Sequence, residues 1–278
     1  MRLITFDPLR AVAIPGARYI KPELVFRYRA DVLAADWLLF PEEWQVNFLV
    51  YGWHKRIFPS PASYHLGRDK VEQTRALWAV APEAVPDTLI LPNSPAGQEE
   101  ALAHFSFPFV AKIPRASMGQ GVFRIENMAD WQAYCAATDV LYVQEYLPID
   151  RDLRVVWVGD QILAHYWRVG RPGAFHNNVA RGGRIDHSPA PRAALELVEH
   201  VARTLGIDHA GFDVAVVDGE PYILEFNVKF GNLGLRELGI AVGPAILAYL
   251  KAQEAEDSGR PGEPSPSQPT TPPVPMAS

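Results

Sequence analysis

Short apolar runs alternate with amphipathic stretches from the start of the chain to about residue 252, a pattern typical of mixed α/β proteins. The apolar run at 37–40 predicts a buried strand, and Pro41 predicts the start of a helix that ends at Gly52. A second short strand is expected at Ile57–Phe58. We therefore expect residues 1–66 to form a short α/β unit.

Residues 67–252 alternate predicted strands and helices more densely, and we expect them to form a second domain. The segments with the apolar or alternating pattern of strands are 108–113, 122–125, 140–146, 153–158, 161–168, 212–217 and 221–226. Gly159-Asp160 and Asp218-Gly219 predict the turns of two hairpins. The segments expected to be helical are one that begins at Asp69, 130–137, 192–205 and about 243–251.

Residues 253–278 differ in composition from the rest of the chain. They contain seven prolines and only two large aliphatic or thioether side chains, Val274 and Met276. Such a segment cannot bury enough apolar surface to offset the chain entropy lost on folding. We therefore expect a disordered Pro-rich tail, with a Pro-rich docking motif as the alternative.

Composition narrows the classes of function. The chain has 26 Lys and Arg against 32 Asp and Glu, a net charge of −6, which argues against a nucleic-acid partner. The single cysteine, Cys135, excludes an internal disulfide framework and a cysteine zinc site. Apolar runs are shorter than the roughly 18 residues that span a bilayer, and residues 1–8 do not resemble a signal peptide. We therefore expect a cytoplasmic protein without a membrane partner, and leave open whether it forms a homo-oligomer.

Lys112 lies on the predicted strand 108–113 and precedes a loop that contains Gly119 and Gly121. Glycines let backbone N–H groups approach a polyphosphate, and a lysine neutralises phosphate charge. The order differs from a G-x-x-x-x-G-K-[ST] loop, because the lysine precedes the glycines and no helix follows. An ordinary hairpin has the same pattern, so the loop alone leaves both interpretations open.

Asp213 and the pair Glu225 and Asn227 lie on the two strands of the second predicted hairpin. Residues 225 and 227 share one face of their strand, so three oxygen donors can converge. Such donors suit Mg²⁺ held jointly with substrate phosphates. The alternative is a solvated surface hairpin, although Ile223 and Phe226 favour a strand with at least one buried face.

The segment from 165 to 192 reverses the charge balance of the chain. It contains five arginines and one acid, Asp186. A solvated charged face usually mixes both signs, whereas a local excess of arginine suits an anion such as a triphosphate or an acyl phosphate.

The order of these features is more specific than any one of them. Along the chain they are Lys112, the glycine loop, Gln144-Glu145-Tyr146, Asp152 with Arg154, the Asn-x-x-Arg-Gly-Gly segment at 178–183, Asp213 and Glu225-x-Asn227. This order resembles the ATP-grasp superfamily, and most closely the RimK-type carboxylate–amine ligases related to glutathione synthetase. The resemblance covers about residues 58 to 250.

The resemblance implies an α/β (α+β) ATP-grasp fold, in which two α/β subdomains at 67–252 clasp ATP after the short unit at 1–66. It implies ATP and two Mg²⁺ or Mn²⁺ ions as cofactors. The residues that match nucleotide-binding positions are Lys70, Lys112, Ser117, Gly119, Gly121, Glu145, Tyr146, Asp152, Asn177 and Asn178. The residues that match metal ligands are Asp213, Glu225 and Asn227. Arg154 and Arg181 match arginines near the transferred phosphate and the acceptor.

The chain departs from the family after Asn227. Many relatives continue with Ala/Pro-Ser/Thr-Pro-Gly, whereas this chain has Val228-Lys229-Phe230-Gly231. If the strand continues, Lys229 shares a face with the two metal ligands. We then expect a catalytic Lys229 that pairs with the acceptor carboxylate or its acyl phosphate. The alternative is that the strand ends at Asn227 and Lys229 points into solvent.

The reaction that the resemblance implies joins a carboxylate to an amine through an acyl phosphate, with release of ADP and phosphate. The partners would be a small-molecule or peptide carboxylate and an amine or amino acid. Two alternatives remain open at this point: an ATP-grasp small-molecule kinase, in which a hydroxyl replaces the carboxylate, and a non-catalytic nucleotide-binding module. The N-terminal unit is also short for the family, and in the family that unit usually helps to select the substrate.

Overall fold

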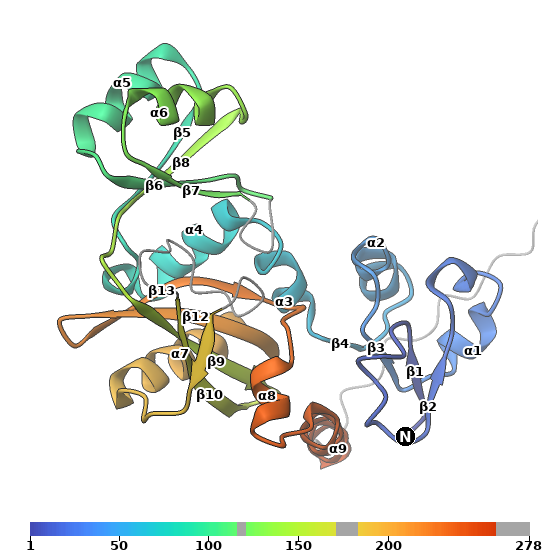
Figure 1. The fold of residues 1–278 in the computed structure, drawn as a ribbon. Coiled ribbons are helices and arrows are strands. Elements are labelled where there is room, and N and C mark those ends of the chain that lie inside the picture. The colour runs from blue at the N-terminus through green and yellow to red at the C-terminus, as the bar shows by residue number, and fades with distance from the viewer. Residues whose placement is uncertain (116–120, 171–182, 260–278) are drawn as a thin grey trace, which may run out of the picture.

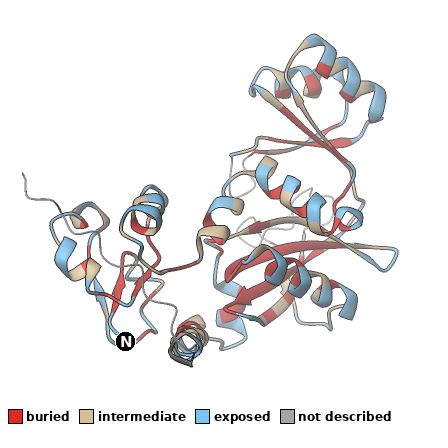
Figure 2. Ribbon diagram, turned by 180° about the vertical axis from the view of Figure 1, so that it is seen from behind, coloured by how far each residue is buried: buried red, intermediate tan, exposed pale blue. Residues whose placement is uncertain are grey.

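The computed structural model describes residues 1–115, 121–170 and 183–259. Within these residues the strands form three sheets, with helices packed around them (Figure 1). We call them the N-terminal, middle and C-terminal sheets, after their order along the chain. Buried residues are concentrated on the strands and on the inward faces of the helices (Figure 2). This is the α/β architecture expected from the sequence.

The N-terminal sheet has the order β2-β1-β3-β4, and its neighbouring strands are parallel. Its strands are β1 (Leu3–Thr5), β2 (Ala17–Tyr19), β3 (Trp37–Leu39) and β4 (Ile57–Phe58). The helical segments around it are η1 (Pro22–Leu24), α1 (Arg29–Leu33), α2 (Glu43–Asn47), the π-helical turn η2 (Phe48–Gly52) and α3 (Pro61–Leu66). β3, the α2–η2 helix and β4 lie where the apolar pattern predicted a strand, a helix and a strand.

The middle sheet has the order β5-β8-β6-β7, and its neighbouring strands are antiparallel. Its elements are β5 (Thr88–Pro92), α5 (Pro95–His104), β6 (Phe109–Lys112), β7 (Val122–Ile125), α6 (Met128–Cys135) and β8 (Val140–Glu145). Both helices lie on the same face of the sheet (Figure 1). Trp131 and Tyr134 of α6 pack there against Phe109, Leu141 and Val143.

The C-terminal sheet has the order β11-β10-β9-β12-β13, and its neighbouring strands are antiparallel. Its strands are β9 (Arg151–Val158), β10 (Gln161–Val169), β11 (Arg184–Asp186), β12 (His209–Val217) and β13 (Glu220–Asn227). The helical segments beside it are α4 (Lys70–Val80), η3 (Pro82–Ala84), α7 (Arg192–Leu205), α8 (Leu233–Glu237) and α9 (Val242–Gly259). Leu77 of α4 and Val198 of α7 share a core with Trp157 and Phe212.

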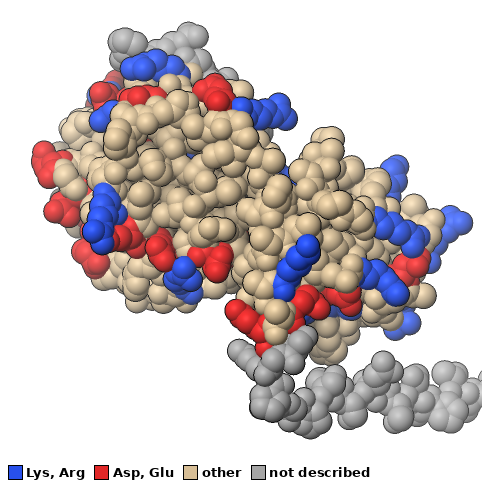
Figure 3. Space-filling view, turned by 90° about the horizontal axis from the view of Figure 1, so that it is seen from below, with Lys and Arg blue, Asp and Glu red and all other residues tan. Residues whose placement is uncertain are grey.

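The N-terminal unit packs directly on the C-terminal sheet. Trp37 and Phe58 share a core with Val156 of β9 and Ile246 of α9. Acidic and basic side chains are interspersed on the face of the molecule that Figure 3 shows. Because one core joins the two units, the division of the chain after residue 66 stays a prediction.

A buried carboxylate also links these units. Asp208, which precedes β12, accepts hydrogen bonds from the Ser60 backbone N–H at 2.7 Å and from the Ser63 hydroxyl at 3.1 Å. Burial raises the pKa of Asp208 to about 7, although these hydrogen bonds oppose the shift. α3 therefore begins on a polar contact with the C-terminal sheet.

α9 corrects the predicted start of the tail. The helix continues to Gly259, so residues 253–259, which we expected to be disordered, are helical. Ala, Gln and Glu favour a helix without large apolar side chains, and the Glu254 carboxylate accepts hydrogen bonds from Trp37 Nε1 at 3.0 Å and Arg56 Nη1 at 2.8 Å. The rest of the predicted tail, 260–278, lies outside the described residues. None of the helices in the described ranges combines the length and the apolar character that a membrane span requires.

Candidate active site

Lys112 lies at the end of β6 in the middle sheet, and its side chain reaches the C-terminal sheet. The residue is 5% exposed, and Nζ donates to the Leu224 carbonyl in β13 at 3.4 Å. Nζ also lies 5.4 Å from the centre of the Tyr142 ring. Burial lowers the pKa of Lys112 to about 8, and the carboxylates of Glu225 and Asp213 oppose this shift. A partly desolvated cation therefore lies where the two sheets meet.

Two arginines and two aspartates form a buried cluster on one face of the C-terminal sheet. Arg154 Nε donates to Asp213 Oδ1 at 2.6 Å, and Arg168 Nη2 lies 2.9 Å from Asp213 Oδ2. Arg168 also forms an ion pair with Asp152. The strand register places Asp213 opposite Arg154, and Asp152 opposite Arg168. None of the four residues is more than 8% exposed, so each buried charge depends on its partners.

The two aspartates of this cluster respond differently to burial. Burial raises the pKa of Asp152, and the nearby Arg168 guanidinium offsets this only in part. Burial also acts to raise the pKa of Asp213, but the combined attraction of Arg154 and Arg168 is stronger and lowers it. Asp213 is therefore the more acidic oxygen donor.

Glu225 lies directly opposite Asp213 in the β12–β13 register. Asn227 Nδ2 donates to Glu225 Oε1 at 3.0 Å, and Lys70 Nζ lies 3.6 Å from Glu225 Oε2. A small recess opens beside these groups. The residues that line it are Gly67, Arg68, Lys70, Gln73, Arg115, Glu225, Phe226 and Asn227.

The donor set of Asp213, Glu225 and Asn227 fits a hard divalent cation. Two of the side chains are carboxylates, and Asn227 donates through Nδ2, which leaves its Oδ1 as an acceptor. Among the residues that the structure describes, no three His, Cys, Asp or Glu side chains come together as metal ligands. A cation here would therefore use two carboxylates and one amide oxygen, with further oxygens from a phosphate ligand, which is a typical arrangement for Mg²⁺.

Comparisons with known proteins show the family of the chain. The family model for the RimK-like ATP-grasp domain matches residues 68–250. The chain belongs to this family. A ribosomal protein bS6–L-glutamate ligase from Escherichia fergusonii is 26% identical over 151 residues, which are 52% of this chain and 50% of the relative. The chain thus spans about half the length of the curated relatives it matches.

Solved structures confirm the expected ATP-grasp fold. A RimK domain ATP-grasp protein from Sphaerobacter thermophilus superposes with a TM-score of 0.66 at 16% identity, covering 90% of this chain and 100% of that chain. D-alanine–D-alanine ligase from Bacillus anthracis superposes with a TM-score of 0.68 at 12% identity, covering 92% and 99%. At these identities the likeness establishes the fold alone.

The RimK-like domain brings several of the predicted site residues into one region, and their roles stay predictions. Glu145 and Tyr146 lie at the end of β8, where the chain passes from the middle to the C-terminal sheet. Glu145 Oε1 accepts the Asp87 N–H at 2.8 Å, and Arg124 lies over the Tyr146 ring at 4.7 Å. These contacts hold the segment that the resemblance assigns to adenine.

Only the base of the predicted glycine loop is described. Gly121 accepts the Ile113 N–H at 2.7 Å, and Pro114 accepts the Lys70 N–H at 3.1 Å. Arg115 Nε donates to Asp69 Oδ2 at 3.0 Å, which ties the loop base to the start of α4. The other residues predicted for this loop and for the basic segment lie outside the described residues: Ser117, Gly119, Asn177, Asn178 and Arg181.

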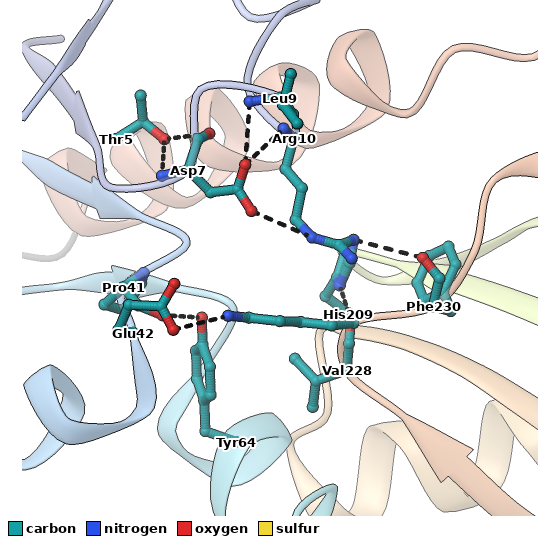
Figure 4. Close-up of polar contacts among 11 residues, drawn as sticks. Thr5, Asp7, Leu9, Arg10, Pro41, Glu42, Tyr64, His209, Val228 and Phe230 are labelled. Carbon is teal, nitrogen blue, oxygen red and sulfur yellow. Dashed lines mark hydrogen bonds and ion pairs between the residues drawn. The ribbon is translucent and has the colours of Figure 1, made fainter. Parts of the chain in front are cut away.

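Lys229 does not follow the expected continuation of the strand. β13 ends at Asn227, and Lys229 Nζ pairs with Glu42 Oε2 of the N-terminal unit at 3.1 Å. The turn is held because His209 Nδ1 donates to the Val228 carbonyl at 2.9 Å (Figure 4). Strand alternation therefore no longer places Lys229 on the face of residues 225 and 227. Lys229 lies instead at the junction between the N-terminal unit and the C-terminal sheet.

Arg168 is the residue of this cluster that the sequence did not single out. The basic segment included it, but nothing in the composition paired it with Asp152 and Asp213. The signal was the β9–β10 hairpin register, which a bulge between Ile162 and Ala164 shifts by one residue.

Proposed function

We propose that this protein is an ATP-dependent carboxylate–amine ligase. The observation that carries the proposal is the buried Lys112 ammonium, which reaches the strand of Glu225 and donates to the Leu224 carbonyl at 3.4 Å, between the two sheets of a RimK-like ATP-grasp domain. A cation beside oxygen ligands suits a triphosphate with its divalent cation. The proposed ATP site lies between the middle and C-terminal sheets.

The proposed reaction has two steps. A substrate carboxylate oxygen attacks the γ-phosphorus of ATP, the bond to the ADP oxygen breaks, and an acyl phosphate forms. An amine nitrogen then attacks the acyl carbon, phosphate leaves, and the nitrogen loses a proton to give an amide. Negative charge shifts among phosphate oxygens in both steps, so preorganised cations in a site that excludes water lower the barrier.

The residues of the site supply cations for the phosphate charge and oxygen ligands for Mg²⁺. The charge of Lys112 is disfavoured by burial, and a bound phosphate would compensate it. Arg154 and Arg168 hold the two oxygens of Asp213 in one orientation. Bound Mg²⁺ would be held by the oxygens of Asp213, Glu225 and Asn227, and would neutralise phosphate charge.

The substrates are proposed by chemical class. The relative from Escherichia fergusonii is named for joining L-glutamate to a ribosomal protein. For this chain we propose an amino acid as the amine, and a carboxylate on a small molecule or peptide as the acceptor.

Product analysis tests the proposed function. The protein is incubated with Mg-ATP and pools of carboxylates, with and without amino acids, and ADP and AMP are quantified. ADP that appears only when both substrates are present supports the ligase. ADP formed with a hydroxyl compound alone indicates a kinase, and AMP with pyrophosphate contradicts the mechanism. Asp213→Asn should abolish ADP release, whereas Asp160→Asn, at an exposed turn, should not.

A further inference from the structure

Among the residues that the structure describes, β13 is the outermost strand of the C-terminal sheet on its side and has a strand partner only in β12. On the edge of β13 that faces away from β12, the side chain of Gln73 in α4 forms hydrogen bonds with the main chain of β13. Its Nε2 donates to the Phe226 carbonyl at 2.9 Å, and its Oε1 accepts the Phe226 N–H at 2.9 Å. One buried amide side chain therefore makes the two bonds that a further strand would make.

The position of this contact is significant because Phe226 lies between Glu225 and Asn227. The N–H of Phe226 belongs to the peptide group that follows Glu225, and its carbonyl belongs to the peptide group that precedes Asn227. Bonds to both groups fix the backbone orientation on the two sides of Phe226. The two bonds from Gln73 therefore constrain the backbone from which both side chains leave the strand.

Gln73 is buried and makes a further hydrogen bond. Gln73 is 4% exposed, and its Nε2 also lies 3.3 Å from the Leu66 carbonyl. Lys70, one turn earlier in α4, pairs with Glu225 itself. The first turn of α4 thus contacts Glu225 through its side chain and its neighbour Phe226 through the backbone.

We propose that Gln73 is a positioning residue for the divalent cation that Glu225 and Asn227 would hold. This inference rests on the proposed function, because it assigns Gln73 to the same site. Gln73 contacts neither the cation nor the nucleotide in this proposal. It keeps the edge strand in the one conformation that directs both oxygen donors to the same point.

The test compares binding of a non-hydrolysable ATP analogue, adenylyl imidodiphosphate, in Mg²⁺ and in EDTA by calorimetry. Gln73→Met keeps the bulk of the side chain and removes both hydrogen bonds. It should weaken binding about tenfold or more in Mg²⁺, the range seen when groups that orient metal ligands are removed, and leave binding in EDTA unchanged.

Gln45→Met is the matched control. Gln45 is also buried, accepts the Glu42 N–H at 2.8 Å and donates to the Pro22 carbonyl at 3.3 Å, but it lies in the N-terminal unit. This variant should keep the wild-type ratio of the two affinities. If Gln73→Met does not fold, Gln73→Asn, whose amide is one methylene too short to reach Phe226, takes its place and should give the same loss.

The outcomes separate this inference from the proposed function. The positioning role is overturned if a Gln73 variant loses affinity equally in Mg²⁺ and in EDTA. It is also overturned if the variant keeps the wild-type affinity in both conditions. A wild-type protein that binds the analogue without any dependence on Mg²⁺ refutes the proposed cation site itself. Hydrogen exchange supplies a readout without ligand: the Phe226 amide should lose protection in the Gln73 variant and keep it in the Gln45 variant.

Discussion

Replacing Lys112 with methionine should stabilise the ligand-free protein and weaken nucleotide binding. Lys112 is 5% exposed, and burial lowers its pKa from 10.5 to about 8. At 1.36 kcal/mol per pKa unit, this difference means that the buried charge costs about 3 kcal/mol of folding free energy at neutral pH. Methionine has a similar length and no charge. Lys112→Met should therefore raise the free energy of unfolding at pH 7 by about 2–3 kcal/mol.

The contribution of Lys112 to the free energy of unfolding depends on pH. Between about pH 8 and pH 10.5 the unfolded chain still holds the Lys112 proton that the folded protein has released. Wild-type stability should therefore rise with pH in this window through Lys112, and the methionine variant should lack this rise. Urea unfolding of both proteins over a pH series measures the difference, which should vanish above about pH 10.5.

Binding should change in the opposite direction. Loss of a charge-assisted contact to phosphate should weaken ATP binding by about 1.5–3 kcal/mol in calorimetry. Lys251→Met, at an exposed position of α9, is the control and should change neither quantity. The reasoning is refuted if Lys112→Met is less stable than wild type at pH 7, or if it binds ATP equally well.

Three further outcomes are expected. Arg168→Met should lower the free energy of unfolding, measured by urea unfolding, by about 3–5 kcal/mol, because it leaves Asp152 buried without its ion-pair partner. A wild-type value would contradict the mutual dependence of these buried charges. Wild-type stability should fall from about pH 4 to about pH 7 through Asp208, since burial raises its pKa to about 7, and Asp208→Asn should reduce that slope in thermal unfolding. Deleting residues 260–278 should leave the melting temperature unchanged, whereas deleting residues 253–278 should lower it by removing the Glu254 contacts. Equal melting temperatures of the two deletion variants would contradict a stabilising role of these contacts.

Local patterns predicted those elements whose signal lies within the element. Four strands of the C-terminal sheet (β9, β10, β12 and β13) and α7 follow from alternation, turn residues and helical periodicity, whereas β11 was not predicted. β5 and α5 were not predicted, because β5 is a short run that ends in Pro92, and the first turn of α5 contains Pro95 and Gly97. The N-terminal sheet joins strands of two or three residues in parallel, and such pairing depends on contacts far apart in the sequence.

Predictions at the site depended on where the backbone changes direction. Strand parity placed Lys229 beside the metal ligands only if the strand continued, and β13 ends at Asn227, which was the stated alternative. Arg168 was missed for a related reason. The pairing closest to the β9–β10 turn, extended along the hairpin, would place Trp167 opposite Asp152, and the bulge brings Arg168 there instead.

A second bulge brings the proposed metal ligands together. The pairing closest to the β12–β13 turn, extended along the hairpin, would place Asp213 opposite Leu224 and leave Glu225 on the other face of the sheet. The bulge leaves Leu224 without a partner in the register, so Asp213 lies opposite Glu225 instead. The carbonyl of this extra residue then accepts the hydrogen bond from Lys112. The insertion of the apolar residue Leu224 therefore places both carboxylates on one face of the sheet and supplies the carbonyl that the Lys112 ammonium contacts.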